Sequence, residues 1–124
     1  MLPLLLLLVF ITTACSSAQK ISSVPATPTS APVDGEQLFA AYCSTCHGPA
    51  GEGLPKLGKP LTNNAFVAGL SDEELLIFLQ EGRRVDDPLN TTGIAMPARG
   101  GNPLVTDEQL RIIVAYLRSL HTKP

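Results

Sequence analysis

The 124-residue chain is poor in basic residues and shows no sustained alternation of apolar and polar side chains, and each shortage excludes a class of protein. From residue 34 onward it carries all 11 acidic residues but only eight of the nine lysines and arginines, a net charge of −3. Binding of nucleic acid needs a basic patch that neutralises phosphates, so nucleic acid is not expected as a partner. A half-buried β-strand needs a period of two residues, so no sheet is expected.

The long apolar run of this chain is N-terminal and too short to span a bilayer as a helix. Residues 1–11 are almost purely apolar, a length that suits the hydrophobic region of a signal peptide. Residues 12–15, Thr-Thr-Ala-Cys, resemble a bacterial lipobox, so we expect residues 1–14 to be cleaved off and Cys15 to be lipidated. Thr12 stands where Leu is usual, and no Lys or Arg precedes the run. An ordinary cleaved signal or an uncleaved anchor is the alternative.

Residues 16–33 are rich in Ser, Ala, Thr and Pro. Such a segment buries too little apolar surface to offset its conformational entropy, which predicts a disordered tether over residues 15–33 that begins at the lipidated cysteine. The folded domain is then expected at residues 34–124. A domain of this size is marginally stable on its own side chains, and a buried cofactor can supply part of its core.

Three helices are predicted in this domain, which makes the fold all-α. The first begins after Asp34 and runs into Cys43. The second begins at Ser71, where Glu74 completes a capping box, and ends near Gly82. The third begins at Thr106 and carries apolar side chains with a period near 3.6 residues. The long connections at residues 48–60 and 86–103 are rich in Gly, Pro and Asn, and loops of this length suggest that they bind something.

The chain has three cysteines, an odd number that does not suit an exported protein held by disulfides. Two of them stand in the C-S-T-C-H run at residues 43–47, the spacing typical of covalent attachment of haem c. Cys43 and Cys46 can each add to one haem vinyl group, and His47 is placed to bind the iron. Positions i, i+3 and i+4 share one helix face, so the three side chains can meet one porphyrin. With Cys15 lipidated, no free thiol is left.

Methionine and histidine are equally scarce, which narrows the choice of a second iron ligand. Apart from the initiator, Met96 is the chain's only methionine, and it precedes a proline in a long loop. His121 is the competing imidazole, in a C-terminal segment that we expect to be solvated. A haem held by His47 and Met96 is closed and suits electron transfer, whereas an open sixth position invites gas binding or peroxide chemistry.

From Gly35 to Leu120 the chain resembles a short bacterial class I c-type cytochrome. The matching segments are Gly35 with Leu38-Phe39, Cys43-x-x-Cys46-His47-Gly48, Pro55-Lys56-Leu57-x-x-Pro60, Ser71–Arg83, Met96-Pro97 and Leu110–Leu120.

This resemblance implies a fold of several helices around one covalently bound haem c. The first and last helices would cross at Gly35, with Phe39 and Tyr116 packed at the contact. His47 would donate its second ring nitrogen to a backbone carbonyl, for which Pro55 is the matching position. This bond would orient the imidazole.

Two consecutive arginines are candidates for binding the haem propionates. Arg83 and Arg84 can act as bidentate donors to a carboxylate, although either can also be a solvated cation at the end of a helix. Asn63, Asn64 and Arg99 are weaker candidates of the same kind.

The preferred function is a membrane-tethered one-electron carrier that docks with redox proteins and has no small-molecule substrate. It would sit on the periplasmic or extracytoplasmic side of a bacterial membrane. The alternative is a fixed haem c subunit of a quinol-oxidising or terminal-oxidase complex. A peroxidase-like or gas-binding haem protein is a third possibility. A thioredoxin-like dithiol would need a βαβ context that the sequence lacks.

Overall fold

The computed structural model describes residues 33–122, so the predictions for the signal peptide, Cys15 and nearly all of the tether lie outside the described residues. The elements are α1 (Gly35–Tyr42), α2 (Ser44–His47), α3 (Ala65–Gly69), α4 (Asp72–Glu81), the 3₁₀ turn η1 (Ala98–Gly101) and α5 (Asp107–Thr122). Residues 33–122 contain no strand, only isolated antiparallel bridges. The all-α prediction is therefore confirmed.

Helix α4 begins and ends at the predicted residues because its signals are local. The Ser71 hydroxyl accepts from the Glu74 amide at 3.3 Å, and the Glu74 carboxylate accepts from the Ser71 amide at 2.8 Å. These two bonds form the capping box, and Gly82 ends the helix with a positive φ. Helix α5 starts in the same way, with reciprocal bonds between Thr106 and Gln109.

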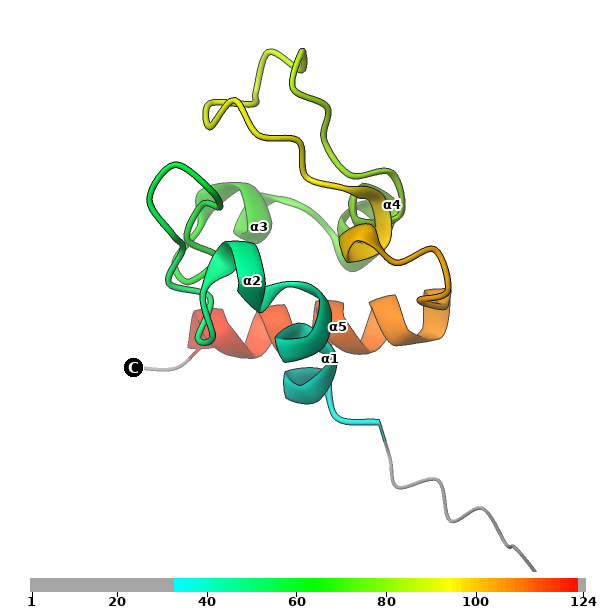
Figure 1. Ribbon diagram of the computed structural model, residues 1–124. Helices are drawn as coiled ribbons and strands as arrows, with labels where there is room; N and C mark the ends of the chain where they lie inside the picture. Colours follow the sequence, from blue (N-terminus) through cyan, green and yellow to red (C-terminus); the bar gives the residue numbers. More distant parts are fainter. Residues whose placement is uncertain (1–32, 123–124) are drawn as a thin grey trace, which may run out of the picture.

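Helix α1 crosses α5 at a glycine, as expected (Figure 1). A Cβ atom at Gly35 would lie 2.8 Å from Tyr116 Cβ and 3.0 Å from the carbonyl oxygen of Ile112. Next to this contact the Phe39 ring, which is fully buried, lies 5.3 Å from the Tyr116 ring. The absence of a side chain at Gly35 is thus what lets the two helix backbones approach.

Helices α1, α4 and α5 together form what we call the helical frame. Their apolar faces meet in one core, which also takes in a residue of α3 and the residue before Thr106. The buried apolar side chains are Leu38, Phe39, Val67, Leu75, Leu76, Leu79, Val105, Leu110, Ile113, Val114, Leu117 and Leu120.

Arg118 of α5 ties the short helix α3 to the frame. Its guanidinium donates to the carbonyl oxygens of Val67 at 2.6 Å and Leu70 at 2.5 Å, and pairs with Asp72 at 2.8 Å. The last carbonyls of a helix have no partner within the helix. Arg118 supplies partners at the end of α3 from a helix far away in sequence.

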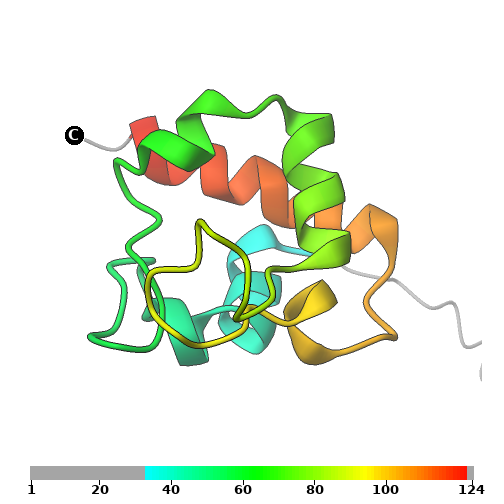
Figure 2. The ribbon, with the colours of Figure 1, turned by 90° about the horizontal axis from the view of Figure 1, so that it is seen from above.

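The remaining chain forms loops on one side of the frame. Residues 83–96, which we call the Met96 loop, join α4 to η1 and stand away from α1 and α5 (Figure 1). Seen from above, this loop lies across the face of the molecule between α2, α3 and α4 (Figure 2). Within the described part of the chain, no helix is long and apolar enough to cross a membrane.

The sequence did not predict two short elements or one helix break. Helix α3 has five residues and is held by Asn64, whose side chain accepts from the amides of Phe66 and Val67. The turn η1 includes Arg99 in the left-handed region, at φ 54°. The predicted first helix is α1, and Cys43, at φ −121°, separates it from α2, which carries Cys46 and His47. Asp34 is the N-cap of α1, and its side chain accepts from the amide of Glu36.

Candidate cofactor site

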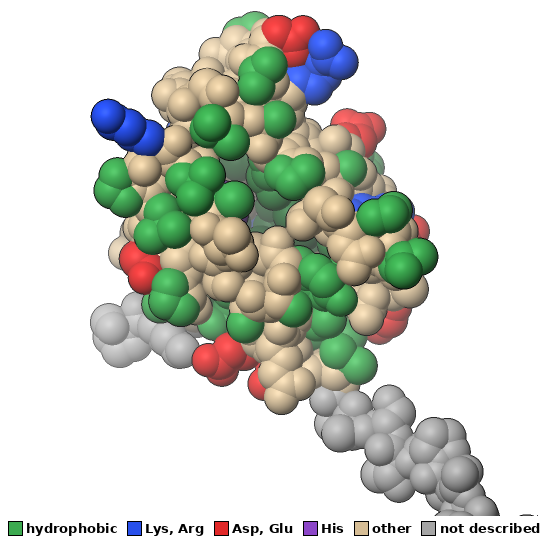
Figure 3. All heavy atoms as spheres, viewed as in Figure 1, with side chains coloured by type: hydrophobic (Ala, Val, Ile, Leu, Met, Phe, Trp, Pro, Cys, Tyr) green, Lys and Arg blue, Asp and Glu red, His purple; other side chains and the backbone are tan. Residues whose placement is uncertain are grey.

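A cavity of about 600 Å³ opens between the helical frame and the loops. Its lining is mostly apolar and comes from α1, α2, α3, α4, α5 and the Met96 loop. In the space-filling view the molecule is hollowed at this place, and hydrophobic side chains surround the opening (Figure 3). A cavity of this size and character suits a large flat apolar ligand that is buried on both faces.

The four residues predicted to hold a haem all line this cavity. Cys43, Cys46 and His47 lie on its α1–α2 wall, and Met96 comes from the loop after α4. Cys46 and His47 follow Cys43 in a single helical turn, with the amides of both donating to the carbonyl of Cys43 at 3.2 and 3.0 Å. The structure thus brings into one cavity the four residues predicted to attach and ligate a haem, although Cys43 and Met96 are 53 positions apart in the sequence.

Burial affects one of the two thiols. It raises the pKa of Cys43 to about 11, and the nearby Cys46 adds to the increase. Burial raises a thiol pKa because it disfavours the thiolate. Cys43 is therefore a neutral, partly buried thiol on the cavity wall.

His47 is oriented by a backbone carbonyl, but that of Lys59 and not of Pro55. The His47 Nδ1–H donates to the Lys59 carbonyl at 2.8 Å, which directs the other ring nitrogen elsewhere and fixes the tautomer. Pro55 is exposed and does not line the cavity, so the prediction for it was wrong. The reason is a tight turn, closed by the bridge between Leu54 and Gly58, that carries Pro55 away from the ring.

Gly58 allows that turn to lie against the haem-attachment segment. A Cβ atom built on Gly58 would clash with the carbonyl oxygen of Cys46 and lie 3.2 Å from His47 Nδ1. Any larger residue would push the turn away from His47 and stretch the bond to Lys59.

Two hydrogen bonds hold the backbone of Met96 in place. Its amide donates to the carbonyl of Arg83 at 2.8 Å, and the Arg83 amide donates to the carbonyl of Met96 at 2.8 Å. This pair forms an isolated antiparallel bridge between the two ends of the Met96 loop. The Met96 side chain is partly buried and packs against the core next to the cavity.

The side chain of Arg83 lies in the cavity wall, over two aromatic rings that pack against each other. Its guanidinium carbon is 4.7 Å from the centre of the Phe66 ring and 4.9 Å from that of Phe78. The side chain is 14% exposed, its Nε is buried without a hydrogen bond, and its ion pair with Asp87 is long at 3.5 Å. An orphaned buried donor is costly, and a carboxylate in the cavity would satisfy it.

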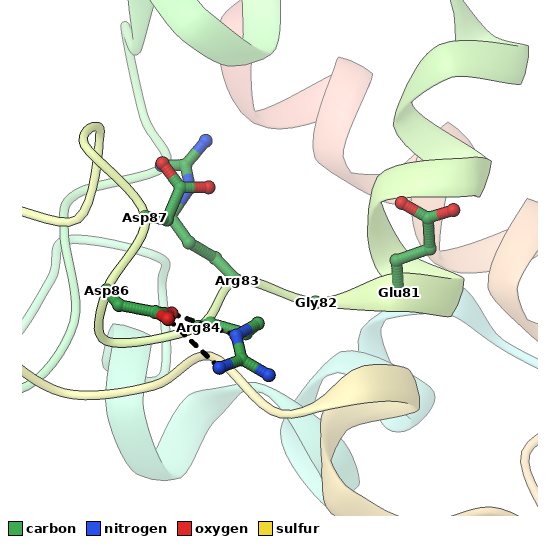
Figure 4. Close-up of a pocket in the computed structure, with 6 residues that line it drawn as sticks. All are labelled: Glu81, Gly82, Arg83, Arg84, Asp86 and Asp87. Atoms are coloured by element: carbon green, nitrogen blue, oxygen red, sulfur yellow. Dashed lines mark hydrogen bonds and ion pairs between the residues drawn. The ribbon is translucent and has the colours of Figure 1, made fainter.

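Arg84 does not share this position, so the geometry does not support its predicted contact with a propionate. Its side chain is 85% exposed and pairs with Asp86 through two bonds of 2.8 and 2.9 Å (Figure 4). It borders a separate surface hollow of about 410 Å³ and is absent from the cavity lining. Successive side chains of an extended backbone point to opposite sides, and the bridge at Arg83 turns that residue inward and Arg84 outward.

The three weaker candidates for binding a propionate also divide between the cavity lining and positions outside it. Asn64 and Arg99 line the cavity, whereas Asn63 does not. Arg99 is already engaged, with bonds to the Val105 carbonyl and to Asp107, both at 2.7 Å. His121 lies in the last turn of α5 with a buried Nε2, contrary to the expected solvated tail, and it does not line the cavity.

Several lining residues were missed by the sequence analysis. Lys59 carried no signal, because its role is that of a backbone carbonyl. Phe66 and Phe78 were visible only as apolar residues, and their rings pack edge to face at 5.0 Å under Arg83. Asn90 lies in a long loop, and the sequence predicted no individual role for it.

Comparisons with known proteins agree with the geometry. The family described as "Cytochrome C oxidase, cbb3-type, subunit III" matches residues 30–117. The cbb3-type cytochrome c oxidase subunit CcoP of Rhodobacter capsulatus is 33% identical over 107 residues, covering 82% of this chain and 33% of that protein. This chain therefore spans about a third of the length of that relative.

Two further similarities come from a smaller protein and from a solved structure. Cytochrome c-555 of Prosthecochloris aestuarii is 33% identical over 86 residues, which is 68% of this chain and 82% of that protein. The KustC0563 c-type cytochrome shares the fold, with a TM-score of 0.52 and 22% identity over 73% of this chain and all of that structure. The family match, the relatives and the four convergent residues lead to one conclusion: the chain belongs to the c-type cytochrome family of cbb3-type oxidase subunit III, and its cofactor is a single, covalently bound haem c.

Proposed function

We propose that this chain transfers single electrons with a haem c that is attached through Cys43 and Cys46 and ligated by His47 and Met96. The observation that carries the proposal is that these four side chains, distant in sequence, line one apolar cavity. When bound, the haem supplies an iron that changes between Fe(II) and Fe(III) without bond-making in a substrate.

The protein residues around the cavity have separate tasks in this proposal. The Lys59 carbonyl holds the His47 ring in one orientation through the 2.8 Å bond. Met96 occupies the position that a gas or peroxide would need, and the combination of His and Met raises the reduction potential. The apolar lining excludes water, which keeps the charge change in a low-dielectric environment.

Arg83 completes the site in this proposal as the partner of a propionate. The support is its place in the cavity wall and its buried Nε, which makes no hydrogen bond and only a long ion pair with Asp87. Its contact with the faces of Phe66 and Phe78 orients the guanidinium before any ligand binds, which reduces the entropy lost on pairing.

The N-terminal segment suggests where the domain works. We propose that it is exported and held by a lipid on Cys15, on the periplasmic side of a bacterial membrane, with residues 15–33 as a tether. The apolar run of residues 1–11 and the cysteine after it support this. Mass spectrometry of the mature protein should find Cys15 at the N-terminus with an acyl modification. An unmodified N-terminus elsewhere would contradict the anchor.

A second candidate is a haem c subunit fixed in a terminal oxidase. It is favoured by the family match and by the CcoP relative, whose name states that it is a cbb3-type oxidase subunit. Purification in mild detergent separates the two candidates. A fixed subunit copurifies with the oxidase in constant proportion, whereas a mobile carrier elutes alone.

The ligand set is tested by optical spectroscopy of the purified haem protein. We expect a low-spin spectrum, the weak far-red band of a Met–Fe(III) bond, and no binding of carbon monoxide to the reduced form. Met96→Leu should lose the far-red band, bind carbon monoxide and have a lower potential. Val85→Leu, a change at an exposed position of the same loop that does not line the cavity, should keep all three properties. A high-spin wild-type protein without the band would overturn the electron-carrier proposal.

A further inference from the structure

The Met96 loop has little regular structure to hold it in place. Apart from the bridge at Arg83 and Met96, its backbone bonds are those of Asp87 to the Arg84 carbonyl at 3.4 Å and of Asn90 to the Asp87 carbonyl at 2.8 Å. Both lie within the outgoing arm of the loop. The backbone alone therefore does not explain how the returning arm, which carries Met96, keeps its position over the cavity.

One side chain supplies the missing connections. The Asn90 amide nitrogen donates to the Arg84 carbonyl at 2.9 Å and to the Ile94 carbonyl at 2.8 Å. Its amide oxygen accepts from the Thr92 amide at 3.1 Å, the Thr92 hydroxyl at 3.2 Å and the Gly93 amide at 3.0 Å. An asparagine side chain has two N–H donors and one oxygen with two lone pairs, so its capacity is fully used.

These bonds join the two arms of the loop beside the ligand. Arg84 follows the bridging Arg83, and Ile94 lies two positions before Met96. In residues 33–122, the bridge and the bond from Asn90 to the Ile94 carbonyl connect the outgoing arm to the part of the returning arm next to Met96. The bond to the Arg84 carbonyl anchors the Asn90 side chain beside the bridge, and the bonds that it accepts from Thr92 and Gly93 close the turn between the arms. Asn90 also lines the cavity, which places this cross-link directly over the cofactor site.

We propose that Asn90 is a positioning residue for Met96, an inference that rests on Met96 being an iron ligand. Its two donor bonds hold the returning arm against the outgoing arm, which keeps the Met96 sulfur at the iron and the sixth position closed. Without these bonds the arms separate more often, because only the backbone bridge still joins them. The Met96 loop is thus held in its ligand-binding conformation before the haem binds, by a side chain that is not itself an iron ligand.

The test is Asn90→Ala in the full-length haem protein, with Asn90→Asp as a second variant. Asp keeps the acceptor oxygen for Thr92 and Gly93 but cannot donate to the carbonyls of Arg84 and Ile94, so it isolates the effect of the two donor bonds. Both variants should show a weakened far-red band and should bind carbon monoxide about tenfold faster or more when reduced. Loss of two neutral hydrogen bonds supports a change of this size.

Asn102→Ala is the matched control. Asn102 is also a loop asparagine whose side chain closes a local turn, with the Leu104 amide at 3.0 Å, but it does not line the cavity. It should leave the band and the carbon monoxide reaction unchanged, even if it lowers the melting temperature. A general loss of stability would affect all three variants alike, whereas a positioning role separates them.

Three results would overturn the inference. If Asn90→Ala and Asn90→Asp keep the wild-type band and rate, Asn90 does not position Met96. If neither variant accumulates with haem while Asn102→Ala does, Asn90 acts in folding instead. A wild-type protein without the far-red band would instead refute Met96 as a ligand, and this inference with it, so the two failures are distinguishable.

Discussion

The helical frame and the Met96 loop are held together in different ways. In the frame, large apolar side chains such as Phe39 and Ile113 are almost entirely removed from solvent. In the loop, Leu89 is 60% exposed and Ile94 is 45% exposed, and the order comes from hydrogen bonds of side chains to the backbone. The frame thus provides stability, while the loop positions Met96, the proposed iron ligand, with few buried apolar side chains of its own.

Loss of the haem should have the largest effect, and it tests whether the helical frame is stable without the cofactor. The variant Cys43→Ser with Cys46→Ser cannot attach haem, which leaves the 600 Å³ cavity unfilled. Without haem the apolar lining of this cavity is exposed to water, and the resulting loss of buried apolar surface should be a large part of the stability of a small domain, which is about 5–15 kcal/mol.

We therefore expect this double variant to lose its helical circular dichroism and its cooperative unfolding transition. The wild-type haem protein is the control, with mass spectrometry to confirm covalent haem in one sample and not in the other. A double variant that keeps a native-like helical spectrum and a sharp transition would show that the helical frame folds stably without the haem.

A change within the frame should have the next largest effect. Gly35→Ala places a methyl group 2.8 Å from Tyr116 Cβ and forces α1 away from α5, so the free energy of unfolding should fall by about 1–3 kcal/mol. Gly69→Ala is the same chemical change in α3, where nothing lies within 4 Å of the new atom. It should leave stability unchanged or slightly increased. Equal losses in denaturant unfolding would refute the close helix crossing.

An effect no larger than that of Gly35→Ala is expected at the link between the frame and α3. Arg118→Met keeps the apolar stem but removes the bonds to the carbonyls of Val67 and Leu70, which should cost about 1–3 kcal/mol of unfolding free energy. Arg111→Met removes an exposed ion pair with Glu73 and should have no measurable effect. Chemical denaturation of both haem proteins provides the comparison. Similar midpoints would mean that α3 does not depend on Arg118.

The parts of this molecule that the sequence predicted are those with local causes. The capping box at Ser71 and Glu74 and the close approach at Gly35 depend on residue type at a fixed spacing. Met96 was predictable as a cavity residue because the chain has no other methionine beyond the initiator. The all-α fold follows from the same periodic patterns.

The parts that were missed depend on the path of a loop. The partner of His47 is a carbonyl, and every residue has one, so its identity follows from the turn that brings Lys59 rather than Pro55 to the ring. The difference between Arg83 and Arg84 depends on the register of a bridge formed with a residue 13 positions away. Neither the turn nor the bridge has a local pattern that residue types reveal.

The place where the described chain begins has a mechanical consequence. The start of α1 lies on the side of the molecule opposite the Met96 loop (Figure 1). A pull applied at this end of α1 is therefore carried first by the crossing of α1 with α5, where the two backbones approach closely at Gly35. Such a pull would reach the Met96 loop last, and the loop would be left facing away from the point where the force is applied.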